Sequence, residues 1–574
     1  MKYFIPEWDD RVDPEYDFTT DSHSKKHYED PYKNDVYIWN IFGLDKVPID
    51  GVLISRMKII ENKNKYKKIL EEGVHKFLNL PKDFEIMGDC GAWGYIDQEE
   101  PPFKTSETLE YYIKCGFDYG VSIDHLIVPA YYKYKEKRWK LTLENAREMF
   151  ELWQSKEHYL NSIRIIGVAQ GWNVESYRKA VKELLRIGYD YIGLGGLARA
   201  PTGLKSDNED IKTLSNVVRG VWLDIRRWMD ETKRKVDIHV FGIARPQLIP
   251  LLMSCGVTSF DSASFLRRAW LSAENNYQTL EGKSYSAIRI PQTERSPRVK
   301  DIENDTMELE KSALQMLRLY DQGKVSINDL MKVLNEYNNM IGQRPEIEKL
   351  YLETLRDMPW KKCPCPICKD IGVEVIIFRG NNRNRRRGFH NTWVFYQTFR
   401  EMSPKILVFT SCTAKKDPNP NLIPAYRRYL PSPIFKVFWE NTLDLPVEIG
   451  ILSAKFGLIN WRQMIPNYDY KMQEKDVPIF VEELKEKLKR YNKIFFIGLG
   501  LYRNVAQKVK EETNYKIDIF PKIELTDREK LDIIEYTKQV KIFREAITQA
   551  IPERSRIIAE NELIKNQHTL ERFL

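Results

Sequence analysis

The chain lacks any apolar stretch long enough to cross a membrane. Its longest apolar run, I-F-F-I-G-L-G-L from Ile494 to Leu501, is far shorter than the roughly 20 residues that a membrane-spanning helix needs. The first ten residues, M-K-Y-F-I-P-E-W-D-D, carry acidic side chains where a signal peptide would have a long apolar segment. We therefore expect a cytoplasmic protein with no membrane partner.

Cysteine is scarce and unevenly spaced. Seven cysteines in 574 residues are too few for a disulfide framework, and three of them fall within the six positions from Cys363 to Cys368. This pattern favours reduced thiols and a metal site. The formal net charge of +8 is modest for the length. It allows acidic partners such as nucleic acid, without identifying one.

The length and the 42% hydrophobic content predict about three domains. From Gly51 to about Arg289, short apolar runs alternate with longer charged segments, which is typical of strand and helix units in a parallel sheet. Eight such units in about 240 residues predict a closed (β/α)8 TIM barrel. The expected strands begin at Gly51 or end at Asp89, Asp124, Gln170, Gly196, Gly242, Asp261 and, for the eighth, Ile290.

Most of these strands end in a polar residue or a glycine. The carboxyl ends of barrel strands share one rim, so such residues converge despite their separation in sequence. Any one of them could instead cap a helix or form a tight turn. For Asp261, which precedes S-A-S-F-L-R-R-A-W, helix capping is a strong alternative to a catalytic role. Three aspartates at one rim, taken together, indicate a catalytic site more strongly than any one of them does alone. The rim set is Asp89, Asp124, Gln170, Gly196, Gly242 and Asp261.

The rest of the chain divides into further segments. Residues 304 to 359 have apolar residues spaced by three and four, which predicts helices. Three new buried-looking strands begin at Lys405 and predict a separate α/β domain, followed by a charged helical tail. The predicted boundaries are 1–50 for an N-terminal extension packing on the barrel, 51–300 for the barrel, 301–402 for connecting helices and a zinc-binding subdomain, 403–525 for an α/β domain of uncharacterised type, and 526–574 for the tail.

A metal site is predicted by C-P-C-P-I-C and a histidine 22 positions later. Three thiolates and an imidazole suit tetrahedral zinc, and four protein ligands leave no position for water, so the ion would be structural. We expect V-E-V-I-I-F to form one strand of a small ribbon. The alternatives are free cysteines beside an unrelated core histidine, or iron. The predicted ligands are Cys363, Cys365, Cys368 and His390.

Five arginines with no acid between them fill the segment R-G-N-N-R-N-R-R-R from Arg379 to Arg387. We expect this run on the loop of the zinc ribbon. Such a run is either solvated or in contact with phosphates. The second alternative gives the hypothesis that Arg383, Arg385, Arg386 and Arg387 bind the backbone of a nucleic acid.

Several motifs, in this order, resemble those of the tRNA-guanine transglycosylase superfamily. M-G-D-C-G-A-W resembles its D-S-G-G-F segment, I-I-G-V-A-Q-G-W its V-Q-G strand, I-G-L-G-G-L its G-G-L loop, F-G-I-A-R-P its G-V-G-x-P turn and S-F-D-S its F-D-C strand. The zinc motif agrees. The N-terminal Y-F-I-P-E-W-D-D-R-V-D-P-E-Y-D-F and D-G-V-L-I-S-R resemble the DpdA branch, which is linked to inserting 7-cyano-7-deazaguanine (preQ0) into DNA. The resemblance to the superfamily spans roughly residues 50 to 400.

The resemblance implies a base exchange in which guanine is replaced by a 7-deazaguanine. Asp261 matches the nucleophile that forms a covalent bond to the sugar, and Asp89 matches a second aspartate that shuttles protons and contacts the base. No organic cofactor is implied beside the structural zinc. The matching base-binding positions are Asp124, Gln170, Gly195, Gly196 and Leu197.

Some positions depart from the family pattern. Gly94 stands where the family has a glutamine, so one base contact is in doubt. Ala198 and Arg199 replace a glycine and a glutamate, and Arg245 lies in the F-G-I-A-R-P turn, where it could meet a phosphate. These changes fit another polymer or another 7-substituent without identifying either.

The preference for DNA as the polymer rests on the N-terminal resemblance, in the setting of a restriction-modification system. A tRNA substrate is the alternative within the same chemistry, and a non-catalytic nucleic-acid-binding barrel is the alternative outside it. Because the target base must be flipped out of a duplex, an ATP-driven partner that opens or nicks DNA is expected. The oligomeric state cannot be read from the sequence.

The C-terminal motifs S-C-T-A-K-K, S-A-K-F-G-L and I-G-L-G-L-Y resemble a widespread domain of uncharacterised function. Ser411, Lys415, Lys416 and Lys455 could form a phosphate or nucleotide pocket at strand ends. An auxiliary packing or docking domain is the alternative. Cys412 could be a nucleophile, although no paired histidine is evident.

Overall fold

The computed structural model describes residues 1–197, 208–243, 245–292, 304–522 and 532–553. The chain forms two compact units. Unit 1 contains Met1–Phe4, Gly51–Asp261 and Arg400–Leu574, and unit 2 contains Ile5–Asp50 and Ser262–Phe399. Within the described ranges, no helix combines the length and the apolar character that a membrane crossing requires.

Eight parallel strands close into a barrel, which confirms the predicted fold class. Seven of them follow the sequence prediction, but the predicted eighth strand, ending at Ile290, is wrong. The barrel is closed by the first residues of the chain, where Phe4 pairs with Asp261. The strands are β1 Lys2–Glu7, β2 Gly51–Ser55, β3 Glu85–Asp89, β4 Tyr119–Val121, β5 Arg164–Ala169, β6 Tyr191–Leu194, β7 Asp237–Val240 and β8 Ser259–Asp261.

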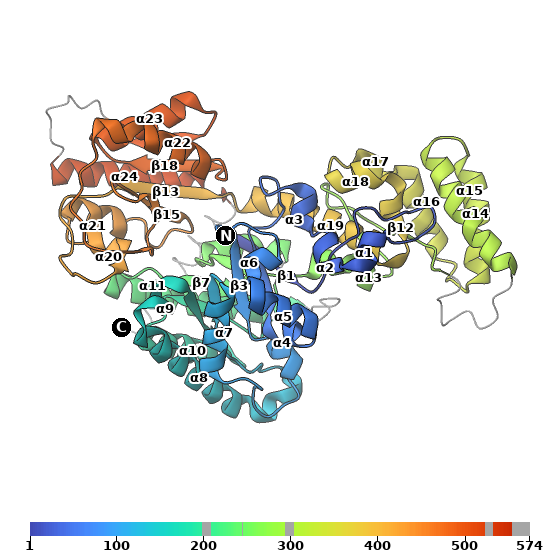
Figure 1. The fold of residues 1–574 in the computed structure, drawn as a ribbon, viewed down its shortest axis with the longest axis horizontal. Helices are drawn as coiled ribbons and strands as arrows, with labels where there is room; N and C mark the ends of the chain where they lie inside the picture. The colour runs from blue at the N-terminus through green and yellow to red at the C-terminus, as the bar shows by residue number, and fades with distance from the viewer. Residues whose placement is uncertain (198–207, 244, 293–303, 523–531, 554–574) are drawn as a thin grey trace. The chain divides into compact units, whose positions relative to one another are not determined.

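Helices connect the barrel strands (Figure 1). Helix α10 shows why they form, because its buried residues recur at helical spacing from Tyr177 to Leu185 and its start is capped by Asn173. The helices are α4 Arg56–Ile60, α5 Lys63–Glu72, α6 Val74–Phe77, α7 Thr105–Cys115, α8 Lys135–Ser155, α9 Glu157–Ser162, α10 Val174–Ile187, α11 Asn208–Thr232 and α12 Ile249–Ser254.

The barrel interior is filled by side chains. Phe4, Leu53, Met87, Tyr119, Val121, Ile166, Val168 and Tyr191 form one buried cluster. The rings of Phe4 and Tyr119 meet edge to face, with centroids 6.1 Å apart. A packed interior confines any reactive groups to the two ends of the barrel.

Unit 2 is mainly helical. The expected ribbon strand is wrong, because Gly372–Ile376 forms a 3-10 turn and only Ile377–Phe378 is extended, paired in parallel with Ile288–Arg289. The elements are α1 Lys25–Glu29, α2 Pro31–Asn34, α3 Ile38–Phe42, α13 Ser264–Leu271, β9 Tyr277–Gln278, β10 Ser284–Tyr285, β11 Ile288–Arg289, α14 Asn304–Asp321, α15 Ile327–Met340, α16 Ile347–Asp357, α17 Pro359–Lys362, α18 Pro366–Ile371, β12 Ile377–Phe378 and α19 Gly380–Met402.

Unit 1 holds a second sheet with the strand order β16-β15-β13-β18-β19, coloured orange to red in Figure 1. The three strands predicted after Lys405 are present as β13, β15 and β18. Its elements are β13 Ile406–Ser411, β14 Ile423–Pro424, α20 Ala425–Tyr429, α21 Pro433–Glu440, β15 Glu448–Ser453, β16 Gly457–Asn460, β17 Met464–Ile465, α22 Val477–Leu488, β18 Lys493–Ile497, α23 Gly500–Glu512, β19 Ile517–Phe520 and α24 Ile533–Ala550.

The predicted tail, 526–574, contains α24, and this helix packs in the core of the second sheet. Its Phe543 is fully buried and meets Phe520 at a centroid distance of 5.2 Å. The other domain boundaries predicted from the sequence stay predictions.

Replacing a side chain of the barrel-closing strand tests the assignment of β1. Phe4→Ala should lower the free energy of unfolding by about 3–5 kcal/mol, because it leaves a cavity in the packed barrel interior. Urea denaturation followed by circular dichroism measures the change. Tyr28→Ala is the matched control, since Tyr28 is 73% exposed. Equal effects of the two substitutions would exclude β1 from the core.

Candidate active site

The predicted rim residues gather at the carboxyl end of the barrel. Asp89 and Asp261 are the last residues of β3 and β8, and Gln170 directly follows β5. Burial, and then the charges of Asp124 and Asp261, raise the pKa of Asp89, so the three carboxyl groups lie near one another. All of these residues belong to unit 1.

Asp261 is held by two donors on one oxygen. Its Oδ1 accepts hydrogen bonds from the backbone N–H of Gly242 at 3.0 Å and from Nε2 of His239 at 3.1 Å. Among the described residues, no hydrogen bond reaches Oδ2. One carboxylate oxygen is therefore fixed while the other is available for attack.

His239 was not identified from the sequence. It is fully buried on β7, and its Nδ1 lies 2.7 Å from Oγ of Ser259, which lies 2.5 Å from the hydroxyl of Tyr191. With Asp261 ionised, Nε2–H donates to the carboxylate and Nδ1 accepts from Ser259. This chain of hydrogen bonds fixes the orientation of Asp261. The only signal in the sequence is a histidine inside an apolar strand.

Asp89 has a strongly raised pKa. Burial raises its pKa to about 8, and the charges of Asp124 and Asp261 add to the effect. The backbone N–H of Gly91 donates to its Oδ2 at 2.9 Å and opposes the shift only in part. Asp89 therefore holds a proton at neutral pH and can donate it.

Asp124 and Gln170 form a buried pair. The amide Nε2 of Gln170 donates to Oδ2 of Asp124 at 2.5 Å, and the thiol of Cys90 donates to Oδ1 at 3.1 Å. Gln170 is 1% exposed, and its Oε1 has no partner among the described residues. A buried acceptor without a donor points to a ligand that carries N–H groups.

Cys90 and Tyr95 support this pair, and neither was identified from the sequence. The hydroxyl of Tyr95 donates to the backbone carbonyl of Asp124 at 2.8 Å and lies 3.0 Å from the sulfur of Cys90. Burial, and then the charge of Asp124, raise the pKa of the Cys90 thiol, so it stays a donor.

Gly195 and Gly196 leave space for Gln170. A Cβ at Gly195 would lie 2.3 Å from Nε2 of Gln170, and one at Gly196 would lie 2.5 Å from Oε1. Gly196 also has a φ of +71°, which favours glycine. Gly195 is fixed by its backbone, since its carbonyl accepts from Tyr177 at 2.7 Å. Leu197 follows, partly exposed, beside a pocket that Trp172 also lines.

The positions that depart from the family pattern differ in how closely they are packed. A Cβ at Gly94 would lie 3.2 Å from Met57, so little space is left for a longer side chain. One guanidinium nitrogen of Arg245 is buried without a partner among the described residues. Ala198 and Arg199 lie outside the described residues.

The four predicted metal ligands meet in unit 2. Nδ1 of His390 lies 3.5 Å from Sγ of Cys363 and 3.4 Å from Sγ of both Cys365 and Cys368. The other ring nitrogen, Nε2, lies 2.8 Å from the carbonyl of Gln278. The backbone thus holds the imidazole with Nδ1 facing the thiols, as metal-binding histidines usually are. These residues could hold a metal ion.

The arginine run does not lie on a loop, and that prediction is wrong. It forms the first turns of α19, where Arg383, Arg386 and Arg387 are at most 4% exposed. Arg383 pairs with Glu374 at 2.7 Å and also contacts Asp21.

The remaining arginines of the run also face the protein. The guanidinium of Arg387 donates to three backbone carbonyls, and burial lowers its pKa to about 9. Arg386 donates to the carbonyl of Asp13 at 3.2 Å. Arg385 also donates, to the carbonyl of Arg11 at 2.8 Å, but its side chain is 30% exposed, so the phosphate-contact hypothesis narrows to this arginine.

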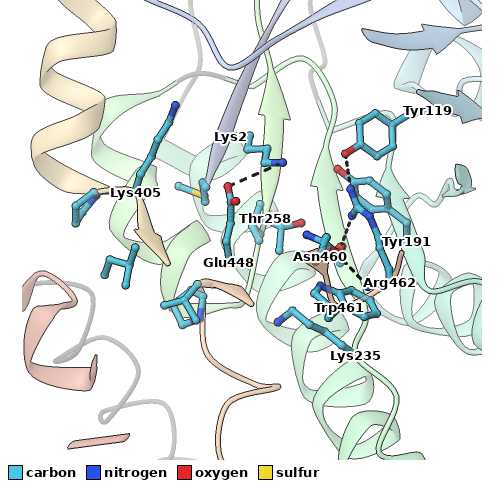
Figure 2. Close-up of a pocket in the computed structure, with 17 residues that line it drawn as sticks. Lys2, Tyr119, Tyr191, Lys235, Thr258, Lys405, Glu448, Asn460, Trp461 and Arg462 are labelled. Carbon is cyan, nitrogen blue, oxygen red and sulfur yellow. Dashed lines mark hydrogen bonds and ion pairs between the residues drawn. The ribbon is translucent and has the colours of Figure 1, made fainter. Parts of the chain in front are cut away.

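A polar pocket lies at the opposite, amino end of the barrel strands, between these and the second sheet (Figure 2). Its charged groups are largely paired with one another. Lys2 contacts Glu448 at 3.9 Å, and Arg462 contacts Asp237 at 3.3 Å and the hydroxyl of Tyr119 at 2.6 Å (Figure 2). This pairing joins the barrel to the second sheet, so we do not place the reaction there.

Several known proteins are similar to this sequence, although no protein-family model matches it. A DNA-guanine transglycosylase of Salmonella montevideo is 34% identical in an alignment of length 429, which covers 69% of this chain and 96% of that protein. Two tRNA-guanine(15) transglycosylases are more distant. The enzyme of Nanoarchaeum equitans is 24% identical, and the alignment covers 41% of this chain and 51% of that protein. The enzyme of Archaeoglobus fulgidus is 27% identical, and the alignment covers 42% of this chain and 44% of that protein.

The raised pKa of Asp89 predicts a dependence of stability on pH. A folded-state pKa of about 8, above the ordinary value of 3.8, means that stability falls as pH rises between these values. Asp89→Asn removes the ionisation, so it should melt at a higher temperature than the wild type at pH 9. The gain should shrink towards pH 5. Differential scanning calorimetry measures both.

The exposed Asp83, just before β3, provides the control for this prediction. Asp83→Asn should leave the melting temperature nearly unchanged at both pH values. A gain for Asp89→Asn that is the same at pH 5 and pH 9 would contradict the assigned protonation state.

Proposed function

The chain belongs to the family of the DNA-guanine transglycosylase of Salmonella montevideo, and from this premise we propose that it replaces guanine in DNA with a 7-deazaguanine such as preQ0. One observation carries the proposal. A carboxylate with one unoccupied oxygen, Asp261, shares the barrel rim with a carboxyl group that retains its proton, Asp89.

Asp261 is the proposed nucleophile. Its Oδ2 attacks the anomeric carbon of the sugar, the bond from that carbon to N9 of guanine breaks, and the electron pair leaves with the base. The product is a covalent sugar ester of Asp261. His239 acts as a positioning residue, because it donates to the oxygen that does not attack.

Asp89 is the proposed proton shuttle. Its proton passes to the leaving guanine, which leaves Asp89 as a carboxylate. The entering base then gives its N9 proton to Asp89 as N9 bonds to the anomeric carbon and the ester bond to Asp261 breaks. Each exchange consumes one proton and returns one, so the enzyme is ready for another cycle.

The base would be recognised beside these two groups. The unpartnered Oε1 of Gln170 is suited to accept from an N–H of guanine or of a 7-deazaguanine. Asp124 positions Gln170 and can exchange its bond to Cys90 for one to the base. Gly195 and Gly196 leave room for the Gln170 amide and, with Leu197, are proposed to bind the base through their backbone groups.

DNA is proposed as the polymer because the DNA-acting relative matches over 96% of its own length. The chain spans only about half the length, or less, of the two tRNA-acting relatives described above. Acting on tRNA is therefore the second candidate. An ATPase partner that exposes the target base fits the cost of flipping it out of a duplex. Arg245 and Arg385 are the proposed phosphate contacts.

Zinc is the proposed metal. Typical bond lengths of about 2.3 Å to sulfur and 2.1 Å to nitrogen would place tetrahedral ligands about 3.6 Å apart, close to the 3.4–3.5 Å found between His390 and the thiols. With four protein ligands the ion stabilises the fold and takes no part in the exchange. A catalytically inactive nucleic-acid-binding barrel would not need Asp89 and Asp261 together.

Removing one thiolate should release the metal. Cys365→Ser is expected to contain less than about a tenth of the zinc of the wild type and to unfold at a lower temperature, because binding and folding of this site are coupled. Plasma mass spectrometry measures the metal. Cys115→Ser, which changes a buried cysteine of the barrel, should keep stoichiometric zinc. Full zinc in Cys365→Ser would exclude the site.

The exchange itself is tested by nucleoside analysis. The protein is expressed in cells that are supplied with the 7-deazaguanine base. Their DNA, once digested, should contain a deazaguanine nucleoside that mass spectrometry detects. Asp261→Asn should lower this signal roughly 1,000-fold or more, since the amide cannot form the sugar ester. Asp83→Asn should retain it. Modified nucleosides in tRNA alone would reject DNA, and wild-type exchange by Asp261→Asn would reject the mechanism.

A further inference from the structure

The carboxyl edge of the second sheet in unit 1 has the form of a ligand site. Strand β13 lies between β15 and β18 and is parallel to both. The chain therefore crosses to opposite sides of β13, and open α/β sheets bind ligands at the carboxyl ends of strands where such a reversal occurs.

Three strand ends meet at the sulfur of Cys412, which follows β13. Its Sγ accepts the backbone N–H of Ala454, just after β15, at 3.4 Å. It also lies 3.0 Å from the hydroxyl of Tyr502, in the first turn of α23 after β18. The edge is thus a single cluster and not three separate loops.

Buried hydroxyl groups form the floor of this cluster. The hydroxyl of Tyr468 lies 2.6 Å from that of Tyr429 and 2.9 Å from Oγ of Ser453. Tyr429 and Ser453 are fully buried, and Tyr468 is 8% exposed. Such a connected polar network fixes the position of the Tyr468 ring.

Two lysines from different loops converge on that ring. Nζ of Lys416 lies 4.5 Å from the ring centroid, and Nζ of Lys455 lies 5.8 Å from it. Across the described part of the chain, neither ammonium group forms an ion pair with a carboxylate. Two ammonium groups at one ring, without a carboxylate partner, concentrate positive charge at this edge and favour the binding of an anion.

The loop that carries Lys416 is rigidly built. The guanidinium of Arg428 is fully buried and donates to the carbonyls of Asp417 at 2.5 Å, Asn419 at 2.7 Å and Asn421 at 2.8 Å. The N–H of Asp417 returns a bond to the carbonyl of Arg428 at 2.7 Å. A fixed loop loses little conformational freedom when it binds a ligand.

Helix α23 adds backbone donors at the same edge. It starts at Gly500, runs to Glu512 and has no side-chain cap at its start. The first N–H groups of a helix lack internal partners, and they favour anions together with the helix dipole.

We propose that this edge binds a phosphoryl anion, held by Lys416, Lys455 and the start of α23. The bound group is either the phosphate of a free nucleotide or a backbone phosphate of a DNA strand. The chemistry is the same in both, because an anion of this kind matches two ammonium groups and a row of N–H donors. The inference does not depend on the proposed base exchange.

The test uses the full-length protein and a matched pair of double variants. Lys416→Gln with Lys455→Gln removes the proposed site. Lys508→Gln with Lys510→Gln removes two exposed lysines of α23 and changes the net charge equally. The probes are inorganic phosphate, dGMP and a fluorescent single-stranded oligonucleotide. Titration calorimetry and fluorescence anisotropy give Kd for each, and base exchange is measured in parallel.

The site variant should raise the Kd of at least one probe roughly ten-fold or more, while the control variant binds as the wild type does. For the oligonucleotide, the slope of log Kd against log salt should fall by about two, one for each lysine. Loss of dGMP and phosphate binding identifies a free nucleotide as the ligand. Loss confined to the oligonucleotide identifies a DNA strand.

Two results would overturn the proposal. One is unchanged binding of all three probes by the site variant, including the case in which the wild type binds none of them. The other is an equal loss in both double variants, which would indicate diffuse attraction by surface charge. Because exchange is measured on the same proteins, a failure of the base-exchange proposal is seen separately.

Discussion

Three carboxyl groups crowd at one end of the barrel, and the cost of keeping their charges together determines how the site is built. Like charges in a poorly solvated space cannot all be ionised. The protein treats each group differently. Asp124 receives donors from Gln170 and Cys90, and Asp261 receives donors from His239 and Gly242. Asp89 is left with a proton. The proposed division between a nucleophile, Asp261, and an acid, Asp89, thus has an electrostatic basis in the fold.

Much of the barrel could be predicted because its strands are short apolar runs that end in polar residues. The strand that closes it could not. Pro6 in K-Y-F-I-P-E argues against a central strand, yet it lies beyond Phe4, the last residue paired with β8, where the missing N–H matters less. The segment around Ile288 has a strand-like pattern but pairs with Ile377, far along the chain. The local sequence pattern cannot show which of these two segments pairs with β8 to close the barrel.

The predicted metal ligands and the arginine run show what a local sequence pattern can and cannot predict. Ligand type and spacing are local, so Cys363, Cys365, Cys368 and His390 were recognised and the structure brings them together. The arginines appeared unpaired because the acids that Arg383 contacts lie outside the run, Glu374 shortly before it and Asp21 more than 300 positions away. His239 escaped notice for a similar reason, since its role comes only from the strand beside it.

The pairing of β1 with β8 has a consequence for how the protein is made. Every other barrel strand lies between these two in the sequence, so the first strand has one open edge until the ribosome has released the last. Open strand edges can pair with those of other chains. The rate of translation through this region, and the chaperones that act on nascent chains, should therefore influence how much of the protein reaches its native state.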